Sequence, residues 1–221
     1  MTLRKILLMI IASIFVIIIS ACNGDSVEEQ IYDHLEETVV LEEEFHTYKD
    51  EITALETEEQ DIYQQIVDLT SDEFDDIQKL SNNALDIIEQ RSNYLEKEKE
   101  SIETSEEEFQ QTKKLIEDLK DEGVKNKAQE MYEVMIERYR SYEKLYDAYK
   151  HALTLEEDLY TLLQSEDASQ KDITNKVSDI NEVYQEVEEA VDVFSEHTNT
   201  YNELKKEFYK KADLNVVFEE D

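Results

Sequence analysis

Cys22 is the only cysteine in the sequence, and the residues around it favour covalent chemistry at its thiol. The three residues before it are Ile19, Ser20 and Ala21, one branched apolar residue followed by two small ones. A deprotonated thiol is a strong nucleophile, so a cysteine can form a thioether with an alkyl donor. Small residues are also typical of the sites at which signal peptides are removed. This stretch therefore combines a candidate cleavage point with a candidate attachment point.

The residues upstream of Cys22 have the organisation of a secretory signal. Arg4 and Lys5 give the N-terminus positive charge, and residues 6–19 are uncharged and almost wholly apolar. This run is shorter than the roughly 20 residues that a helix needs to span a bilayer core. The arrangement resembles the signals of bacterial lipoproteins, which implies that Cys22 carries a diacylglyceryl thioether and becomes the mature N-terminus. The alternatives are an ordinary signal peptide with an incidental cysteine and an uncleaved anchor.

Five tyrosines at helical spacing form a stripe that could contact a ligand. Aromatic faces can stack on sugar rings, so the stripe is a candidate platform for a glycan. The same spacing also results from core packing, which would bury the rings between helices and bring the hydroxyls to the edge of the bundle. Packing is the favoured interpretation, and the glycan platform is the alternative. The stripe consists of Tyr132, Tyr139, Tyr142, Tyr146 and Tyr149.

Two charged residues, Arg91 and Glu98, occupy seam positions of a predicted helix one heptad apart. Ser105 and Thr112 continue this polar series at the same spacing. Polar seam residues can fix the register of packed helices, and a charged one can pair with a charge on a neighbouring helix. We expect this role for Arg91 and Glu98. The alternative is a polar groove that binds a ligand.

The sequence contains no recognisable motif for catalysis or for a metal site. It has no second cysteine, no GxSxG, no glycine-rich phosphate loop and no HExxH. Glu43 and His46 form one E-x-x-H pair, but di-iron bundles need a second pair on another helix. The acidic clusters lack the alternating ligands and the glycine turn of a calcium loop. We therefore predict a protein that is not an enzyme and that has no cofactor and no metal site.

Helical periodicity accounts for most of the chain, which has two glycines and no proline. Thr70 and Glu73 have the spacing of a capping box and predict a tight turn. Gly123 predicts a helix end in the left-handed conformation, and Ser169 with Asp172 predicts a helix start. Apolar residues recur at alternating spacings of three and four in four segments: 27–69, 74–119, 132–163 and 173–208.

These segments predict an all-α fold, an elongated antiparallel up-and-down bundle of four long helices with coiled-coil packing. The alternative joins the first two segments into one very long helix and gives a three-helix arrangement. The predicted organisation is a signal peptide (1–21), a lipid-anchored tether (22–30), a helical bundle (31–211) and a C-terminal tail (212–221).

The formal net charge of −35 limits the partners of the chain. A strongly acidic surface repels nucleic acid and anionic lipid headgroups. Attachment to the membrane must therefore come from the lipid on Cys22 and not from charge. With the only cysteine acylated, the fold would have no disulfide and would depend on packing.

Residues 79–110, KLSNNALDIIEQRSNYLEKEKESIETSEEEFQ, resemble the YkyA-type cell-wall-binding lipoproteins of Gram-positive bacteria. The lipobox at Cys22 and the helical pattern out to Phe208 are similar too, so the resemblance covers nearly the whole chain. It implies a helical bundle tethered to the outer face of the cytoplasmic membrane. We expect a non-enzymatic module that binds the cell wall or acts as a scaffold, with peptidoglycan or a wall-associated protein as partner. The alternative is an extracytoplasmic chaperone or regulator that binds a partner protein through a bundle groove.

Overall fold

The computed structural model describes residues 26–214 and residue 216 of the chain. The predicted signal peptide (1–21) and the lipidation site Cys22 lie outside the described residues, as do most positions near the C-terminus. None of the described helices is long and apolar enough to cross a membrane.

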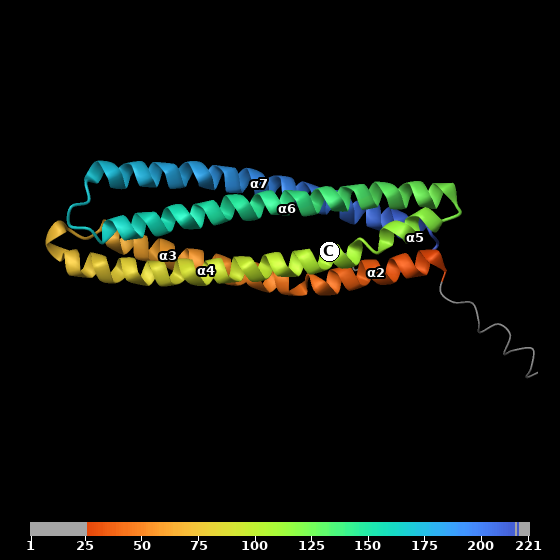
Figure 1. Ribbon diagram of the computed structural model, residues 1–221, viewed down its shortest axis with the longest axis horizontal. Helices are drawn as coiled ribbons and strands as arrows, with labels where there is room; N and C mark the ends of the chain where they lie inside the picture. Colours follow the sequence, from red (N-terminus) through yellow and green to blue (C-terminus); the bar gives the residue numbers. More distant parts are fainter. Residues whose placement is uncertain (1–25, 215, 217–221) are drawn as a thin grey trace, which may run out of the picture.

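Four long helical rods pack antiparallel, and the described residues contain no strand (Figure 1). A short 3-10 helix, η2 (Ser71–Glu73), precedes the second rod. At 1.5 Å per residue, the 42 residues of α6 extend over roughly 63 Å. The four-helix prediction is confirmed, and the three-helix alternative is wrong because the chain turns at residues 68–70. The rods consist of α2 (Val27–Leu41) with α3 (Glu43–Val67), α4 (Phe74–Phe109) with α5 (Thr112–Asp118), α6 (Glu122–Leu163), and α7 (Gln170–Lys211).

Capping side chains fix the turns between the rods. At the first turn the carboxylate of Glu73 accepts the backbone N–H of Thr70 at 3.0 Å. At the last turn the hydroxyl of Ser169 accepts the backbone N–H of Asp172 at 3.2 Å. Each bond satisfies a donor or acceptor that the helix start leaves unpaired. Both turns are where the sequence predicts them.

Helix α2 begins inside the predicted tether (22–30). The hydroxyl of Ser26 accepts the N–H of Glu29 at 3.1 Å, and the carboxylate of Glu29 accepts the N–H of Ser26 at 2.7 Å. This reciprocal cap starts the helix at Val27, where the apolar periodicity of segment 27–69 predicts it.

The prediction that Gly123 ends a helix is wrong. Gly123 is the second residue of α6, and no described glycine has a positive φ. A carboxylate oxygen of Asp121 accepts the N–H groups of Gly123 and Val124 at 2.8 and 2.9 Å, so this position starts a helix. The left-handed conformation occurs instead at Asp213, with φ of 56°, just after the end of α7.

Side-chain hydroxyls bind backbone carbonyls at the interruptions of the first two rods. Between α2 and α3, the hydroxyl of Ser101 donates to the carbonyl of Leu41 at 2.7 Å, and Glu42 has φ −92° and ψ 0°. Between α4 and α5, the hydroxyl of Thr112 donates to the carbonyl of Phe109 at 2.7 Å. The first and second rods, which periodicity predicts as one helix each, thus consist of two consecutive helices.

The helices pack as two intimate pairs, α3 with α4 and α6 with α7. Contact between α4 and α6 joins the pairs along the centre of the bundle. At one end α7 reaches α2, where the rings of Tyr32 and Tyr209 lie 5.3 Å apart and Lys205 lies 3.3 Å from Glu36. Helices α3 and α7 are not among the closely packed pairs. The bundle is thus less tightly closed between α3 and α7 than elsewhere.

Candidate functional site

Two neighbouring hollows lie between α3 and α7, above side chains of α4 and α6. Their volumes are about 650 and 420 Å³. Glu56 and Tyr184 line both, so together the hollows form one elongated depression, which we call the α3–α7 groove. Exposed residues such as His46 and Asn181 line its rims, and the groove therefore opens to solvent.

The α7 wall of the groove is an apolar stripe that no other helix fully covers. Its residues recur at alternating intervals of three and four positions, the spacing that is typical of a buried helix face. Val187 is buried, but Val191 is 41% exposed, and the other members are half-buried. The stripe consists of Val177, Ile180, Tyr184, Val187, Val191 and Phe194. This wall could pack against a bound molecule.

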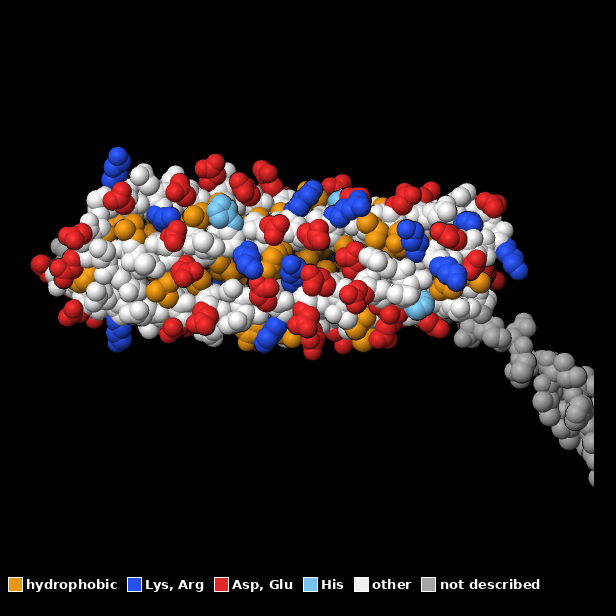
Figure 2. Space-filling model, in the orientation of Figure 1, with side chains coloured by type: hydrophobic (Ala, Val, Ile, Leu, Met, Phe, Trp, Pro, Cys, Tyr) orange, Lys and Arg blue, Asp and Glu red, His pale blue; other side chains and the backbone are white. Residues whose placement is uncertain are grey.

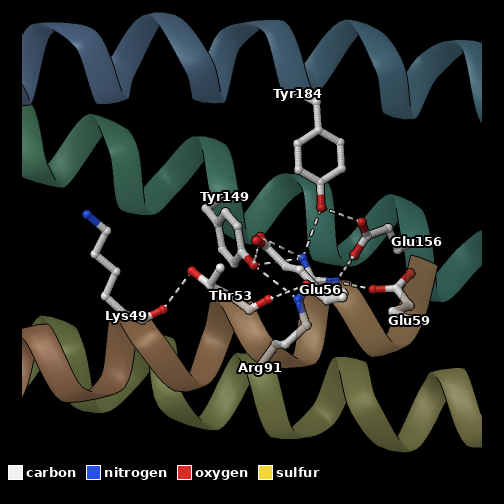
Figure 3. A network of polar contacts seen from close by, with 9 residues as sticks. Lys49, Thr53, Glu56, Glu59, Arg91, Tyr149, Glu156 and Tyr184 are labelled. Carbon is white, nitrogen blue, oxygen red and sulfur yellow. Dashed lines mark hydrogen bonds and ion pairs between the residues drawn. The ribbon is translucent and has the colours of Figure 1, made fainter. Parts of the chain in front are cut away.

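Arg91 lies beneath the junction of the two hollows and is 1% exposed (Figure 3). Its guanidinium donates to carboxylates of Glu59 on α3 and Glu156 on α6, the latter at 2.8 Å. It also donates to the hydroxyls of Tyr149 and Tyr184, at 2.7 and 2.9 Å. The network joins all four rods. The predicted role of Arg91 in fixing register is thus supported by its contacts, and its partners come from both neighbouring pairs of helices.

The Arg91 network contains more carboxylates than cationic groups. Burial, and to a smaller extent the charge of Glu156, raise the pKa of Glu59 to about 7, although the charge of Arg91 acts in the opposite direction. Burial also raises the pKa of Glu156, while Arg91 lowers it. One guanidinium cannot fully compensate two buried carboxylates. Both carboxyl groups therefore lose their protons less readily than an exposed glutamate does.

A second buried arginine, Arg138, lies at the other end of the larger hollow. Its two terminal nitrogens donate to the two oxygens of Glu42, at 2.8 and 2.7 Å. Its Nε donates to the hydroxyl of Thr198 at 3.0 Å. This is a bidentate ion pair, in which both terminal nitrogens of the planar guanidinium bind the carboxylate. Arg138 therefore ties α6 to α7 and to the junction of α2 and α3.

Glu98 lines the larger hollow and is only 6% exposed. Unlike Glu59 and Glu156, it takes part in none of the ion pairs found among the described residues. Burial raises its pKa to about 7, and the nearby hydroxyl of Tyr142 and the charge of Lys49 lower it only in part. The prediction that each residue pairs with a charge on a neighbouring helix is therefore confirmed for Arg91 and wrong for Glu98. Glu98 instead lines a groove, as the alternative interpretation of these polar seam residues predicts.

The stripe tyrosines are largely buried, as packing at seam positions predicts. Tyr139, Tyr142, Tyr146 and Tyr149 are between 2% and 8% exposed. Tyr132 is half-buried and stacks on Phe109, with ring centroids 5.2 Å apart. Tyr142, Tyr146 and Tyr149 nevertheless line the larger hollow. A molecule in the groove would meet these three side chains from one side and would not lie on an exposed platform.

The other residues considered in the sequence are not brought together into a site. Cys22 and the lipobox residues Ile19, Ser20 and Ala21 lie outside the described residues. His46 lines the groove, but within the described chain no group of three or more His, Cys, Asp or Glu side chains could hold a metal ion. The view in Figure 2 shows acidic side chains spread over the whole visible face, with apolar side chains gathered along its middle. The surface charge is thus distributed and not confined to one patch.

A family model described as "Putative cell-wall binding lipoprotein" and named YkyA matches residues 26–211. The chain belongs to this family. A relative in Bacillus subtilis (strain 168), "Uncharacterized lipoprotein YkyA", is 30% identical over 129 residues. The match spans 58% of this chain and 58% of that relative, less than two thirds of its length. Membership of a lipoprotein family implies a membrane-anchored, extracytoplasmic location.

A solved structure supports the fold independently. It is a conserved protein of unknown function from Staphylococcus aureus, with a TM-score of 0.59 and 16% sequence identity. The similarity covers 86% of this chain and 98% of that one. At this level of identity the likeness concerns the fold alone.

Several residues of the groove and of its ion pairs are not recognisable in the sequence as parts of a site. Glu59 is an acidic residue in the apolar frame of the first rod, and it is the partner of Arg91. Glu156 and Glu42 are two among 57 acidic residues, so nothing in the sequence separates them from the surface. The α7 stripe is visible as periodicity. Its exposure depends on how far α7 stands from α3, which only the structure shows.

Proposed function

We propose that the chain is a non-enzymatic lipoprotein, anchored by a lipid on Cys22 to the outer face of the cytoplasmic membrane, that binds the cell wall through the α3–α7 groove. The observation that carries the proposal is the groove itself, with its half-exposed apolar wall and its polar floor. The family description supports the cell wall as the target.

The anchor is tested by replacing the cysteine. Two acyl chains give stable membrane attachment where one would be marginal. We expect wild-type chain to incorporate labelled palmitate and to fractionate with membranes, and Cys22→Ala to lose both properties. A Cys22→Ala variant that remains in the membrane fraction without label would contradict lipid anchoring at this residue.

The negative net charge of the chain disfavours anionic polymers as its wall ligand. With a net charge of −35, the chain is repelled by anionic wall polymers unless divalent cations bridge the two. Neutral glycan and peptide stems carry no such penalty. We therefore expect the protein to sediment with purified peptidoglycan sacculi in the absence of Mg²⁺. Binding that appears only with Mg²⁺ would assign the interaction to anionic polymer and refute this choice of ligand.

The groove offers a matched pair of variants for the same assay. Val191 lines the groove, whereas Val193 is exposed to a similar extent, 43%, and does not line it. Val191→Arg places a long charged side chain on the groove wall, and Val193→Arg makes the same change in charge outside it. We expect only Val191→Arg to lose sacculus binding. Equal losses in both variants would refute the groove as the binding site.

A second function, as an extracytoplasmic chaperone or regulator, is favoured by the α7 stripe. An amphipathic helix of a partner protein could lay its apolar face against such a stripe. A photoreactive residue at position 191 tests this in cells. Crosslinking to one defined protein would support the second function, and crosslinking to wall fragments would support the first.

A further inference from the structure

Glu98 is a buried carboxylate without the counter-charge that its neighbours have. Glu59 and Glu156, which also line the groove, are both bound by Arg91, and the nearby half-buried Glu42 is bound by Arg138. Glu98 is 94% buried, yet no lysine, arginine or histidine of the described chain lies within 4.0 Å of its carboxylate. Buried charges in proteins are normally paired. The missing partner is therefore the feature to be explained.

The surroundings of Glu98 suit a cation attached to an apolar arm. Phe45, Tyr142 and Phe194 line the same hollow, and their ring centroids lie 5.8 to 6.0 Å from one another. Aromatic rings attract cations through their faces and pack well against methylene groups. A cation of the chain already approaches one of these rings: the guanidinium of Arg138 lies 4.8 Å from the centroid of Phe194.

We propose that Glu98 binds the primary ammonium group of a ligand whose aliphatic arm lies in the larger hollow against Phe45 and Tyr142. The ligand class is an amine-bearing peptide of the cell wall, and in this form the inference rests on the proposed wall binding. The hollow, at about 650 Å³, has room for such an arm. An acidic ligand is disfavoured, because Glu56 and Glu188 line the hollow together with Glu98.

Lys49 is the alternative partner that the chain itself supplies. It lines the hollow from α3, and its charge lowers the pKa of Glu98, but it stands outside ion-pair distance and its side chain is exposed. A ligand ammonium would compete with Lys49 for the carboxylate. An amine ligand should therefore bind a variant without Lys49 as well as it binds wild type, or more tightly. A ligand that is recognised through its own carboxylate would bind the same variant less tightly than wild type.

The experiment compares sacculi before and after N-acetylation of their free amines. The full-length lipoprotein in non-ionic detergent is sedimented with each preparation. We expect acetylation to weaken binding of wild type by about tenfold or more, the loss typical of a hydrogen bond to a charged group. Glu98→Gln should bind untreated sacculi with a similar loss and respond little to acetylation. Glu89→Gln, an exposed glutamate on the same helix, should behave as wild type.

The outcomes separate the inference from the proposed function. Wild type that binds both preparations equally would overturn the ammonium site and leave wall binding intact. Wild type that binds neither would refute wall binding, and the site is then decided with a small probe, Nα-acetyl-lysine methylamide, titrated by NMR. Saturable shifts in wild type and in Lys49→Gln, but not in Glu98→Gln or with the Nε-acetylated probe, would support it. Equal shifts in Glu98→Gln, or their loss in Lys49→Gln, would overturn it.

Discussion

Replacing Glu98 by glutamine should stabilise the protein in alkaline solution and leave it nearly unchanged in acid. The side chain is 6% exposed, and burial raises its pKa from the usual 4.5 to about 7. The folded state therefore holds the proton more tightly than the unfolded state does. The stability contributed by the protonated carboxyl is fully present below about pH 4.5 and is lost as the pH rises through 7.

The size of the effect follows from the difference between the two pKa values. At 1.36 kcal/mol per unit, ionised Glu98 lowers the free energy of unfolding by about 3 kcal/mol at pH 8. Glutamine has nearly the same shape and does not ionise. We expect Glu98→Gln to lie within about 1 kcal/mol of wild type at pH 5 and to exceed it by up to about 3 kcal/mol at pH 8.

Urea unfolding of the full-length chain in non-ionic detergent, repeated at pH 5, 6, 7 and 8, measures this difference. Glu89→Gln removes the same charge from an exposed position of α4, and it corrects for the general self-repulsion of an acidic chain. A constant difference between Glu98→Gln and wild type across this range would refute the reasoning. So would an equal gain in Glu89→Gln, since the gain would then come from net charge and not from a buried carboxyl.

Two further variants test the core and the corrected helix boundary. Arg91→Met should lower the free energy of unfolding by about 3–5 kcal/mol at pH 7.5, since it leaves Glu59 and Glu156 buried without their cation. Urea unfolding should show most of this loss restored when both acids are also changed to glutamine, and Arg140→Met, at an exposed ion pair, should change little. Gly123→Ala should raise the melting temperature and add up to about 0.5–1 kcal/mol, because Gly123 is helical, the closest atom to the new methyl is the flexible end of Lys211, and the capping oxygen of Asp121, 3.1 Å away, has to move only slightly. A destabilised Gly123→Ala would show that the methyl disturbs the Asp121 cap and would refute this expectation.

The rods and their turns could be predicted because their signals are local. Periodicity at three and four residues marks each buried face, and the caps at Thr70 and Ser169 depend on residues within one helical turn. Gly123 was misassigned because a glycine near a helix boundary suits either a start or an end. Asp121, two residues earlier, decides between them by accepting two N–H groups. The sequence contains both residues but not the backbone angle.

The site could be predicted only in part, because its decisive features are relations between distant segments. Arg91 is recognisable as a charge in an apolar frame, and Glu59 as a break in another frame. That the two meet depends on the register of α3 against α4, and Glu156 enters from a third rod. The difference between Arg91 and Glu98 is invisible in the sequence, where both are polar seam residues. Two acidic side chains from other rods bind Arg91, whereas no cationic side chain of the described residues lies within ion-pair distance of Glu98.

Arg91 and Glu98 therefore have opposite effects on stability: Arg91 stabilises the bundle, and ionised Glu98 destabilises it. Arg91 satisfies its donors with side chains from the other three rods, so its removal should destabilise the protein. Glu98 should instead make the fold less stable as it ionises, and it does so within a hollow lined by aromatic rings. A titratable group in a cleft whose pKa is shifted is a candidate functional residue. Functional sites commonly lower the stability of a protein. If a bound ammonium supplies the missing charge, the ligand should recover part of the roughly 3 kcal/mol lost at pH 8, and it should raise the melting temperature of wild type more than that of Glu98→Gln.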